Sequence, residues 1–321
     1  MSQSSLFKHF PPPQFLNPER IGISFSDSSI KVVKFGSGAT KFPVQTLLIP
    51  LDPGIVVGGL VVNAEELTKK IAQARNKFRS HYVSFTVPDE STYIFNASIP
   101  IMTSEDLHEG VAFTIEENVP LSLEDTVFDY VPIAIQPQAS GVGSGAKVVV
   151  VASPKKEVES IISILRAAEF EPLGCLPESQ AIAEAVIPKD FVGTAVVMHT
   201  RDYRIGIYLV KDKVVQFSTL RTITKDDYEK DLQDEYGKFL EYWSKYDTGS
   251  NHSIQAMFVC GEFEYARRAI SAMSGSAQYP ERALLANVWG NMFAVDEHMP
   301  ELAYETSLSF AGAIGAAMSK I

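Results

Sequence analysis

Two polar turns, each set between short apolar strands, hold the side chains of this sequence that could perform chemistry. The first turn lies in GISFSDSSIKVVKFG, residues 22–36, and carries Ser24, Ser26 and Lys31. The second lies in MHTRDYR, residues 198–204. A turn of this kind binds a nucleotide phosphate when glycines let its backbone N–H groups approach the ligand and an acid orients a Mg²⁺ ion. The question is whether either turn keeps the residues that this chemistry needs.

Other kinds of reactive site find no support in the residue spacing. The six His residues are scattered without the spacing of metal ligands, so we expect no metal site. Cys175 and Cys260 each lie in an apolar stretch, which favours buried free thiols over a disulfide and fits a reducing, cytosolic compartment. No G-x-S-x-G motif marks a nucleophilic serine. Zinc, redox and serine hydrolase chemistry are therefore not expected.

Composition bounds the class of protein and of partner. The chain has 321 residues, is 45% hydrophobic and has a mean hydropathy of +0.03, which suits a globular protein with two domains. Its net charge of −11 argues against nucleic acid and against charge-driven binding to anionic lipid. We find neither a signal peptide nor an apolar run of the ~20 residues that a membrane span needs. We therefore expect a cytoplasmic protein without a direct membrane span.

Hydrophobic periodicity predicts the elements that must position the two turns. Residues 1–18 read as a flexible, proline-containing tail. Strands are expected at 21–25, 30–34, 44–49, 82–87, 93–99, 126–135, 147–152, 194–199, 204–210, 214–219 and 256–262, and helices at 64–78, 103–118, 155–168, 224–245 and 308–320. The proposed helix caps are Asn63, Thr103 or Ser104, and Thr224, and a flexible loop is expected at 139–145. Each half opens with strand, polar turn and strand, which indicates a two-lobed α/β chain.

An ordered set of motifs extends this interpretation to a family. The segments resemble those of PilM, the actin-like protein family of type IV pilus assembly. They are PIMTSEDL at 100–107, EENVPL at 116–121, LEDTVFDY at 123–130, VVVASPKKEV at 149–158, AAEFEPL at 167–173 and PESQAIA at 177–183. The resemblance implies an α/β, actin-like two-lobed ATPase fold with ribonuclease H-like halves and a small inserted subdomain of the FtsA type, called 1C.

The resemblance also implies a division of the chain. Lobe 1, called 1A, is expected to consist of residues 19–87, 172–190 and 305–321. The inserted subdomain 1C is expected at 88–171, and lobe 2, called 2A/2B, at 191–304.

For the partner, the resemblance implies a platform component that binds the cytoplasmic N-terminal tail of a PilN-like inner-membrane protein. The expected groove lies between lobe 1 and the inserted subdomain, with Phe113, Glu117, Pro120 and Tyr130 as candidates. Core packing is the favoured alternative for Phe113 and Tyr130. Members of the family also form rings, so other pilus platform proteins and further copies of the chain are possible partners. The aromatic stripe of the helix expected at 224–245 is read as core, and it becomes a self-association face only if that helix is exposed.

Mapped onto the family pattern, the first turn lacks the residues that bind nucleotide. Ser24 takes the place of the Asp that orients Mg²⁺, Ser26 takes the place of the phosphate-loop Gly, and Lys31 matches the family Lys. Asp27 adds negative charge at the tip of the turn, which repels phosphate.

The remaining motifs are altered as well. The second turn, around Thr200, lacks its acid and its glycine, and the adenosine motif keeps one glycine, Gly261. Glu178 matches a family Glu near the cleft, but it is equally well interpreted as a carboxylate at the start of a helix. Arg201 and Arg204 could contact an anion, although a solvated turn arginine is the favoured interpretation.

These departures together predict a pseudo-ATPase scaffold. They are hard to reconcile with efficient Mg-ATP hydrolysis, so we expect no cofactor or, at most, weak ATP/Mg binding. The alternative is an active or weakly ATP-binding actin-like ATPase. A sugar or acetate kinase would need a general-base acid and a glycine-rich second hairpin, and neither is visible.

Overall fold

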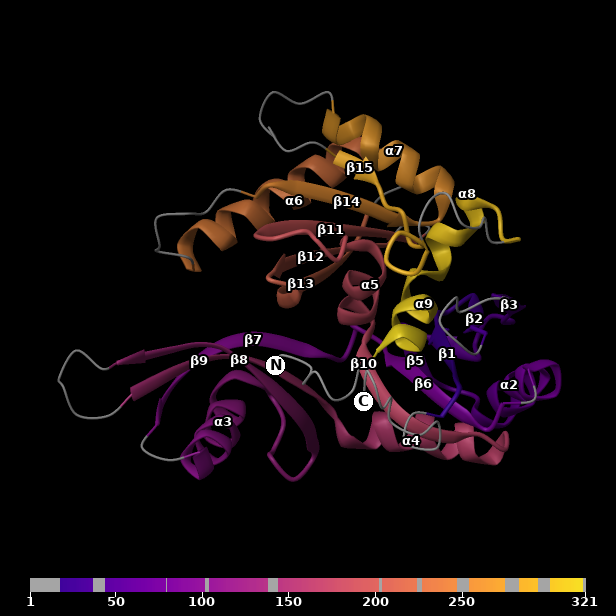
Figure 1. The fold of residues 1–321 in the computed structure, drawn as a ribbon, viewed down its shortest axis with the longest axis horizontal. Helices are drawn as coiled ribbons and strands as arrows, with labels where there is room; N and C mark the ends of the chain where they lie inside the picture. Colours follow the sequence, from indigo (N-terminus) through magenta and orange to yellow (C-terminus); the bar gives the residue numbers. More distant parts are fainter. Residues whose placement is uncertain are drawn as a thin grey trace, which may run out of the picture.

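The computed structural model arranges the chain as two mixed sheets with helices on their outer faces and between them, and a smaller third sheet to one side (Figure 1). The described residues are 18–36, 44–78, 80–101, 104–137, 144–201, 204–223, 227–246, 254–274, 283–293 and 301–319. The predictions for the tail before residue 18, for Thr103 and Thr224 as caps and for most of the loop at 139–145 lie outside them. The two-lobed α/β architecture expected from the sequence is confirmed.

The first sheet has the strand order β10-β6-β1-β2-β3. Its strands are β1 (Arg20–Phe25), β2 (Ser29–Lys34), β3 (Gln45–Pro50), β6 (Tyr82–Val87) and β10 (Glu171–Pro177). β1, β2 and β3 form an antiparallel meander, whereas β6 and β10 run parallel to β1. After β3 the chain forms a separate short antiparallel pair, β4 (Val56–Val57) and β5 (Leu60–Val61). The β1–β2 turn, which carries Ser26, is therefore held by strands buried on both faces.

Two helices cover the outer face of this sheet, α2 (Ala64–Phe78) and α4 (Lys155–Ala167). Asn63 caps α2 as predicted, because its side-chain oxygen accepts the N–H of Glu66 at 3.1 Å. The buried residues of α2 and α4 recur at helical spacing and face one core. The sequence-based division placed α4 within the inserted subdomain at 88–171, yet its apolar side chains belong to the core of the first sheet.

The second sheet has the order β13-β12-β11-β14-β15. Its strands are β11 (Thr194–Arg201), β12 (Arg204–Lys211), β13 (Val214–Thr222), β14 (Ala256–Gly261) and β15 (Ala283–Leu285). Helices α6 (Tyr228–Tyr246) and α7 (Phe263–Ser274) pack on its outer face. The aromatic stripe of α6 is core, since Tyr228, Tyr236 and Phe239 are buried there.

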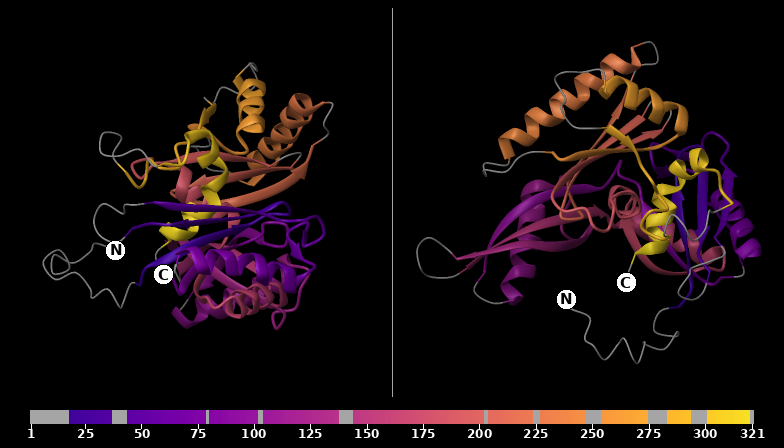
Figure 2. Two further views of the ribbon diagram at one scale, coloured as in Figure 1. Left: turned by 90° about the vertical axis from the view of Figure 1, so that its right-hand side faces the viewer. Right: turned by 45° about the horizontal axis from the view of Figure 1, so that its top comes forward.

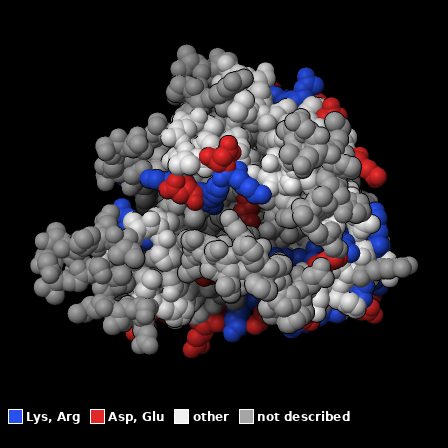
Figure 3. Space-filling model, viewed as in Figure 1, with Lys and Arg blue, Asp and Glu red and all other residues white. Residues whose placement is uncertain are grey.

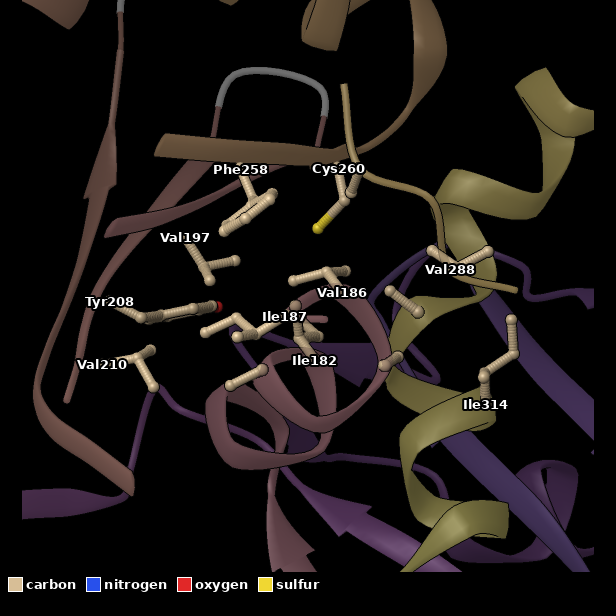
Figure 4. Close-up of a cluster of buried hydrophobic side chains, with 14 of the residues drawn as sticks. Ile182, Val186, Ile187, Val197, Tyr208, Val210, Phe258, Cys260, Val288 and Ile314 are labelled. Atoms are coloured by element: carbon tan, nitrogen blue, oxygen red, sulfur yellow. The ribbon is translucent and has the colours of Figure 1, made fainter. Parts of the chain in front are cut away.

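A layer of short helices separates the two sheets. It consists of α5 (Glu178–Val186), α8 (Tyr304–Ser307), the 3-10 turn η2 (Leu308–Phe310) and α9 (Ala311–Met318). Figure 4 shows Ile182 and Val186 of α5 beneath Val197, Phe258 and Cys260 of the second sheet. A glycine lets α9 pack closely on β1, because a Cβ on Gly22 of β1 would lie 2.0 Å from the carbonyl oxygen of Ala313 in α9.

The third sheet has the order β7-β9-β8 and carries one helix on one face. Its elements are β7 (Tyr93–Ile101), α3 (Ser104–Asn118), β8 (Thr126–Pro137) and β9 (Ser144–Pro154). Val111 and Ile115 of α3, and Val119 just after the helix, are buried against the sheet. The opposite face turns toward the second sheet (Figure 2, right). There the Asn96 side-chain amide donates to the carbonyl oxygen of Gln216 in β13 at 3.0 Å.

Candidate functional site

The two polar turns meet where the two main sheets face each other. The β1–β2 turn comes from the first sheet and the β11–β12 turn from the second. Asp27 at the tip of the first turn and Arg204 at the start of β12 form an ion pair, with 2.9 Å between Oδ2 and Nη2. The structure therefore brings together the two turns that the sequence singled out, and it does so by direct contact.

A network of charged side chains joins the two lobes at this point. We call it the inter-lobe network; it consists of Asp27, Glu90, Glu178, Arg201 and Arg204. Arg201 lies 3.1 Å from Glu178 and 3.6 Å from Glu90 (Nη to Oε), and Arg204 lies 3.3 Å from Glu90. The guanidinium groups come from β11 and β12 of the second sheet, and the carboxylates come from the β1–β2 turn, the segment between β6 and β7, and the start of α5.

The centre of this network is shielded from water. The side chains of Arg201, Glu90 and Glu178 are 12%, 14% and 5% exposed. The favoured interpretation of Arg201 as a solvated turn residue is therefore wrong. Its partners lie more than 20 positions away in the chain, where no local pattern could reveal them. Glu178 is the first residue of α5, as one of its two interpretations predicted, and its side chain pairs with Arg201.

Burial and neighbouring charge shift the pKa of the central groups in opposite directions. Burial raises the pKa of Glu178 to about 7, with Asp89 and Glu90 adding to the rise and Arg201 opposing it. Burial acts to lower the pKa of Arg201, but Glu178 and Glu90 outweigh it and the pKa is raised. Arg201 therefore stays charged, while Glu178 titrates near neutral pH.

Lys31 and His199 lie in the same buried region. Burial lowers the pKa of Lys31, the lysine that matches the family pattern, and Arg201 lowers it further. The pKa of His199 is lowered well below its usual range by burial, then by Arg201 and Lys31, so this imidazole is neutral. Burial is the largest cause of both pKa shifts, and the neighbouring cations add to it.

The first turn uses its own polar groups internally. The N–H of Ser26 donates to the carbonyl oxygen of Ser29 at 2.9 Å, and the N–H of Ser29 donates to the Ser26 hydroxyl at 3.1 Å. The Asp27 carboxylate accepts the N–H groups of Gly58 and Gly59, each at 3.0 Å. Although burial acts to raise the pKa of Asp27, these two bonds and Arg204 lower it, so the carboxylate is charged. Asp27 therefore fastens this turn to the neighbouring loop and to the second lobe.

Packing and internal hydrogen bonds position Ser24, Thr200 and Gly261. Ser24 is buried, and a Cβ on Gly312 of α9 would lie 3.3 Å from its Cβ. The Thr200 hydroxyl donates to the carbonyl oxygen of Cys260 at 3.1 Å. Gly261 has φ +108°, and a Cβ there would lie 2.0 Å from the Thr200 carbonyl oxygen. Its glycine is thus required by the close approach of β11 and β14, whether or not a base lies nearby.

These residues do not fit Mg-ATP. The N–H groups of Ser26 and Ser29 are already bonded within the turn, and the two arginines are already paired with carboxylates. A triphosphate entering here would break those pairs and face the charges of Asp27, Glu90 and Glu178 at close range. Among the described residues, no three His, Cys, Asp or Glu side chains converge on a point that could hold a metal ion.

A second candidate site is a groove of about 590 Å³ between the third sheet, β10, α5 and β13. Its walls are mainly apolar, with the polar groups Asp129, Cys175 and Glu184 among them. Tyr130 is among its lining residues, but its side chain packs against the core between the third sheet and α3. Its ring also lies 6.0 Å from that of His108 on α3.

The other three candidates for the partner site do not line this groove. Phe113 lies on the outer side of α3 and is 66% exposed, so the favoured core-packing alternative is wrong for it. Glu117 and Pro120 are exposed at the end of the same helix. Residues that sequence reasoning missed are Val127 and Val131, which alternate on the groove-facing side of β8 and are 41% and 45% exposed. The available signal was their spacing of four residues in TVFDYV, an even number that places both side chains on one face of a strand.

Two sheets facing each other across α5 and α9, with a polar hairpin from each sheet at their contact, define an actin-like ATPase fold. The solved PilM–PilN type IV pilus biogenesis complex shares it with a TM-score of 0.75 and 17% identity, covering 94% of this chain and 98% of that one. The cytoplasmic domain of EpsL, an inner-membrane component of the type II secretion system of Vibrio cholerae, aligns with a TM-score of 0.54 and 9% identity. That alignment covers 95% of this chain and 97% of the other.

The family follows from the sequence match. The family model of the type IV pilus assembly protein PilM matches residues 22–215, more than half of the chain, so the chain belongs to the PilM family. A search of curated protein sequences gave no match. No helix among the described residues is long and apolar enough to cross a membrane.

Proposed function

We propose that this chain is a pseudo-ATPase scaffold of a type IV pilus, or related type II secretion, assembly platform. It works in the cytoplasm and is held at the inner membrane by a PilN-like protein whose cytoplasmic tail it binds. The observation that carries the proposal is the inter-lobe network: ion pairs between the lobes stand where relatives of this fold would need a nucleotide.

The network explains how the scaffold keeps its shape without ATP. In an actin-like fold a nucleotide between the hairpins would hold the two lobes together. Here Arg201 and Arg204 make that connection through Glu90, Glu178 and Asp27. A rigid arrangement of lobes is useful for a protein that presents a binding groove, because a preformed site loses less conformational entropy on binding.

The groove along β8 supports the partner part of the proposal. Exposed apolar side chains that gather along one groove are typical of an interaction site, and Val127 and Val131 are exposed on the groove side of β8. On the face drawn in Figure 3, Lys and Arg side chains are interspersed with Asp and Glu side chains, as suits a protein partner better than nucleic acid. The PilM–PilN complex, which shares the fold, is a precedent for the partner.

The division of the chain and its assembly are part of the same proposal. We take the inserted unit to begin after β6 and to comprise the third sheet and α3, with α4 returning to lobe 1. Further copies of the chain forming a ring, together with other platform proteins, complete the assembly that the family suggests.

The test for the pseudo-ATPase is a titration with ATP and Mg²⁺, measured by calorimetry and by thermal unfolding. A ligand at about 100 times its Kd adds about 2.7 kcal/mol to the stability of the form it binds. We expect neither heat of binding nor a shift in melting temperature, with an intact actin-like ATPase as the positive control. Saturable binding followed by turnover would overturn the pseudo-ATPase and favour the active alternative.

The test for the partner is binding of the PilN-like tail from the same organism, followed by fluorescence anisotropy. Val131→Asp places a charge on the exposed apolar face of β8 and should weaken binding at least about tenfold. Val192→Asp is the matched control, because Val192 is 79% exposed and does not line the groove. If the wild-type protein binds no such tail while remaining folded, the proposed partner is wrong.

A further inference from the structure

The groove of the proposed function has a continuation with different chemistry. A second pocket of about 580 Å³ lies between the third sheet and the β12–β13 hairpin, with Trp243 of α6 in its wall. It shares Val131 and Val214 with the groove. The two spaces are therefore parts of one channel along the face of the third sheet that is turned away from α3.

The floor of this channel is β8. Val127, Val131 and Ile133 are 41%, 45% and 39% exposed and line it from end to end. At ~3.3 Å per residue, the six steps from Val127 to Ile133 span about 20 Å, enough for about six residues of an extended peptide. An extended segment of a tail could thus occupy both the groove and the second pocket.

The two ends of the channel carry opposite charge. The groove end holds Asp129 and Glu184, and no lysine or arginine lines it. The second pocket holds Lys147 and Lys211, neither of which forms an ion pair with a described residue, against one acid, Asp212.

The second pocket also offers hydrogen-bond donors. The indole N–H of Trp243 has no acceptor among the described residues, and the side chains of Asn96 and Gln216 complete the polar wall. Ammonium, indole and amide N–H groups together favour an occupant that carries carboxylates or carbonyl oxygens.

We propose that the channel imposes a direction on the bound tail. Its membrane-distal part lies in the second pocket, where Lys147 and Lys211 receive acidic side chains, and its membrane-proximal part leaves past Asp129 and Glu184. This inference rests on the proposed function, since it assumes that a membrane-protein tail occupies the groove. The assignment of the two ends follows from the excess of Lys and Arg that cytoplasmic segments carry close to their membrane span.

Charge at the channel ends would select direction and partner. A tail placed the other way would put its basic flank against two lysines and its acidic part against two carboxylates. Like charges brought together at an interface cost affinity and suppress wrong pairings. The apolar floor on its own would accept either direction.

The experiment uses the tail peptide of the partner test with a short run of Glu, Ser or Lys added at its membrane-distal end, and a second set with the run at the other end. We expect distal Glu to bind about five- to tenfold tighter than distal Lys, with Ser between them, and the proximal set to show the reverse order. The difference should shrink at about 1 M salt, where the Debye length is about 3 Å.

The matched variants are Lys147→Glu/Lys211→Glu and, as a control with the same change in charge, Lys155→Glu/Lys156→Glu at the exposed start of α4. The first pair should invert the preference for the distal run, and the control should leave it unchanged. All four lysines are on the surface or partly exposed, and melting temperatures would verify that each variant folds.

The outcomes separate this inference from the proposed function. Equal affinity for Glu and Lys runs, with binding of the parent peptide still lost in Val131→Asp, overturns the direction and leaves the tail groove in place. An inverted order in the wild type assigns the opposite direction and also overturns the inference. Failure of the parent peptide to bind at all overturns both.

Discussion

Removing Arg201 tests whether the inter-lobe network stabilises the arrangement of the two lobes, as the proposed function requires. In Arg201→Met, Glu178 loses its cation and Glu90 keeps only Arg204, at positions where the wild-type side chains are 5% and 14% exposed. Breaking a buried ion pair by deleting one partner costs about 3–5 kcal/mol, because the remaining charge is left in a poorly solvated place. Methionine fills most of the volume, so the cavity contribution is small.

Protonation of Glu178 limits this loss and makes it depend on pH. In the wild type the folded-state pKa of Glu178, about 7, lies above its unfolded value of 4.5. The contribution of Glu178 to stability is therefore fully present below about pH 4.5 and is lost as pH rises through 7, a change of about 3 kcal/mol. Without Arg201 the carboxyl group is still harder to ionise. The variant should therefore lose only about 1 kcal/mol near pH 5.5 and about 3 kcal/mol near pH 8.5.

The assay is urea unfolding of both proteins across this range of pH. Arg221→Met is the matched control: Arg221 pairs with Glu235 at 3.2 Å, but its side chain is 56% exposed, so the expected loss is below about 1 kcal/mol at any pH. A loss for Arg201→Met no larger than that of Arg221→Met, or a loss that does not change with pH, would refute the assignment of Arg201 as the central cation of a buried network.

Two further predictions concern the backbone and the thiols. Gly261→Ala should lower the free energy of unfolding by more than about 1 kcal/mol, because φ is +108° and the new Cβ would meet the Thr200 carbonyl oxygen. Thermal or urea unfolding would measure this loss. Unchanged stability would contradict the close approach of β11 and β14. The prediction that both thiols are buried is wrong for Cys175, which is exposed, whereas Cys260 is fully buried. Only Cys175 should therefore react with a thiol reagent before unfolding. Burial, and after it Asp129, raises the pKa of Cys175. Asp129→Asn should therefore speed the modification of Cys175 near pH 8, which absorbance would measure. Modification of both thiols at the same rate in the native protein would show that the core around β14 is open.

Cys175 also gives a direct measure of groove occupancy, because it lines the groove proposed for the tail. A bound tail should slow its modification in proportion to the fraction bound. This measurement needs no label on the peptide.

The inter-lobe network changes how the missing motifs are understood. Loss of an acid and a glycine at Ser24 and Ser26 alone would leave an empty space that a nucleotide of low affinity could still enter. In the structure Asp27 instead pairs with Arg204, and Arg201 and Arg204 both pair with Glu90. Under the proposed function, these ion pairs take the place of a nucleotide and hold the lobes together, which would suit a scaffold better than a switch.

Local patterns in the sequence determined the regular elements. The helical spacing of Leu67, Ile71 and Phe78 and the cap at Asn63 predicted α2, and the aromatic stripe predicted α6, because each signal lies within a few residues of the element it specifies. β10 was not predicted, since Pro172, Gly174 and Pro177 interrupt it and its burial pattern does not alternate. Parallel pairing with β6 supplies the hydrogen bonds that make this segment a strand.

Side-chain environment at the site was decided only by the tertiary structure. The sequence alone marked Glu178, Thr200 and Gly261 as members of one site, through their order within family motifs. It could not show that Arg201 is buried or that Glu90 is its partner, because these residues are distant in the chain and their spacing carries no period. A charge is solvated or paired according to what the other lobe places against it, and that depends on how two sheets pack across α5 and α9. The sequence therefore determined which elements form and which family they belong to, and the packing of the lobes determined that ion pairs stand between the hairpins.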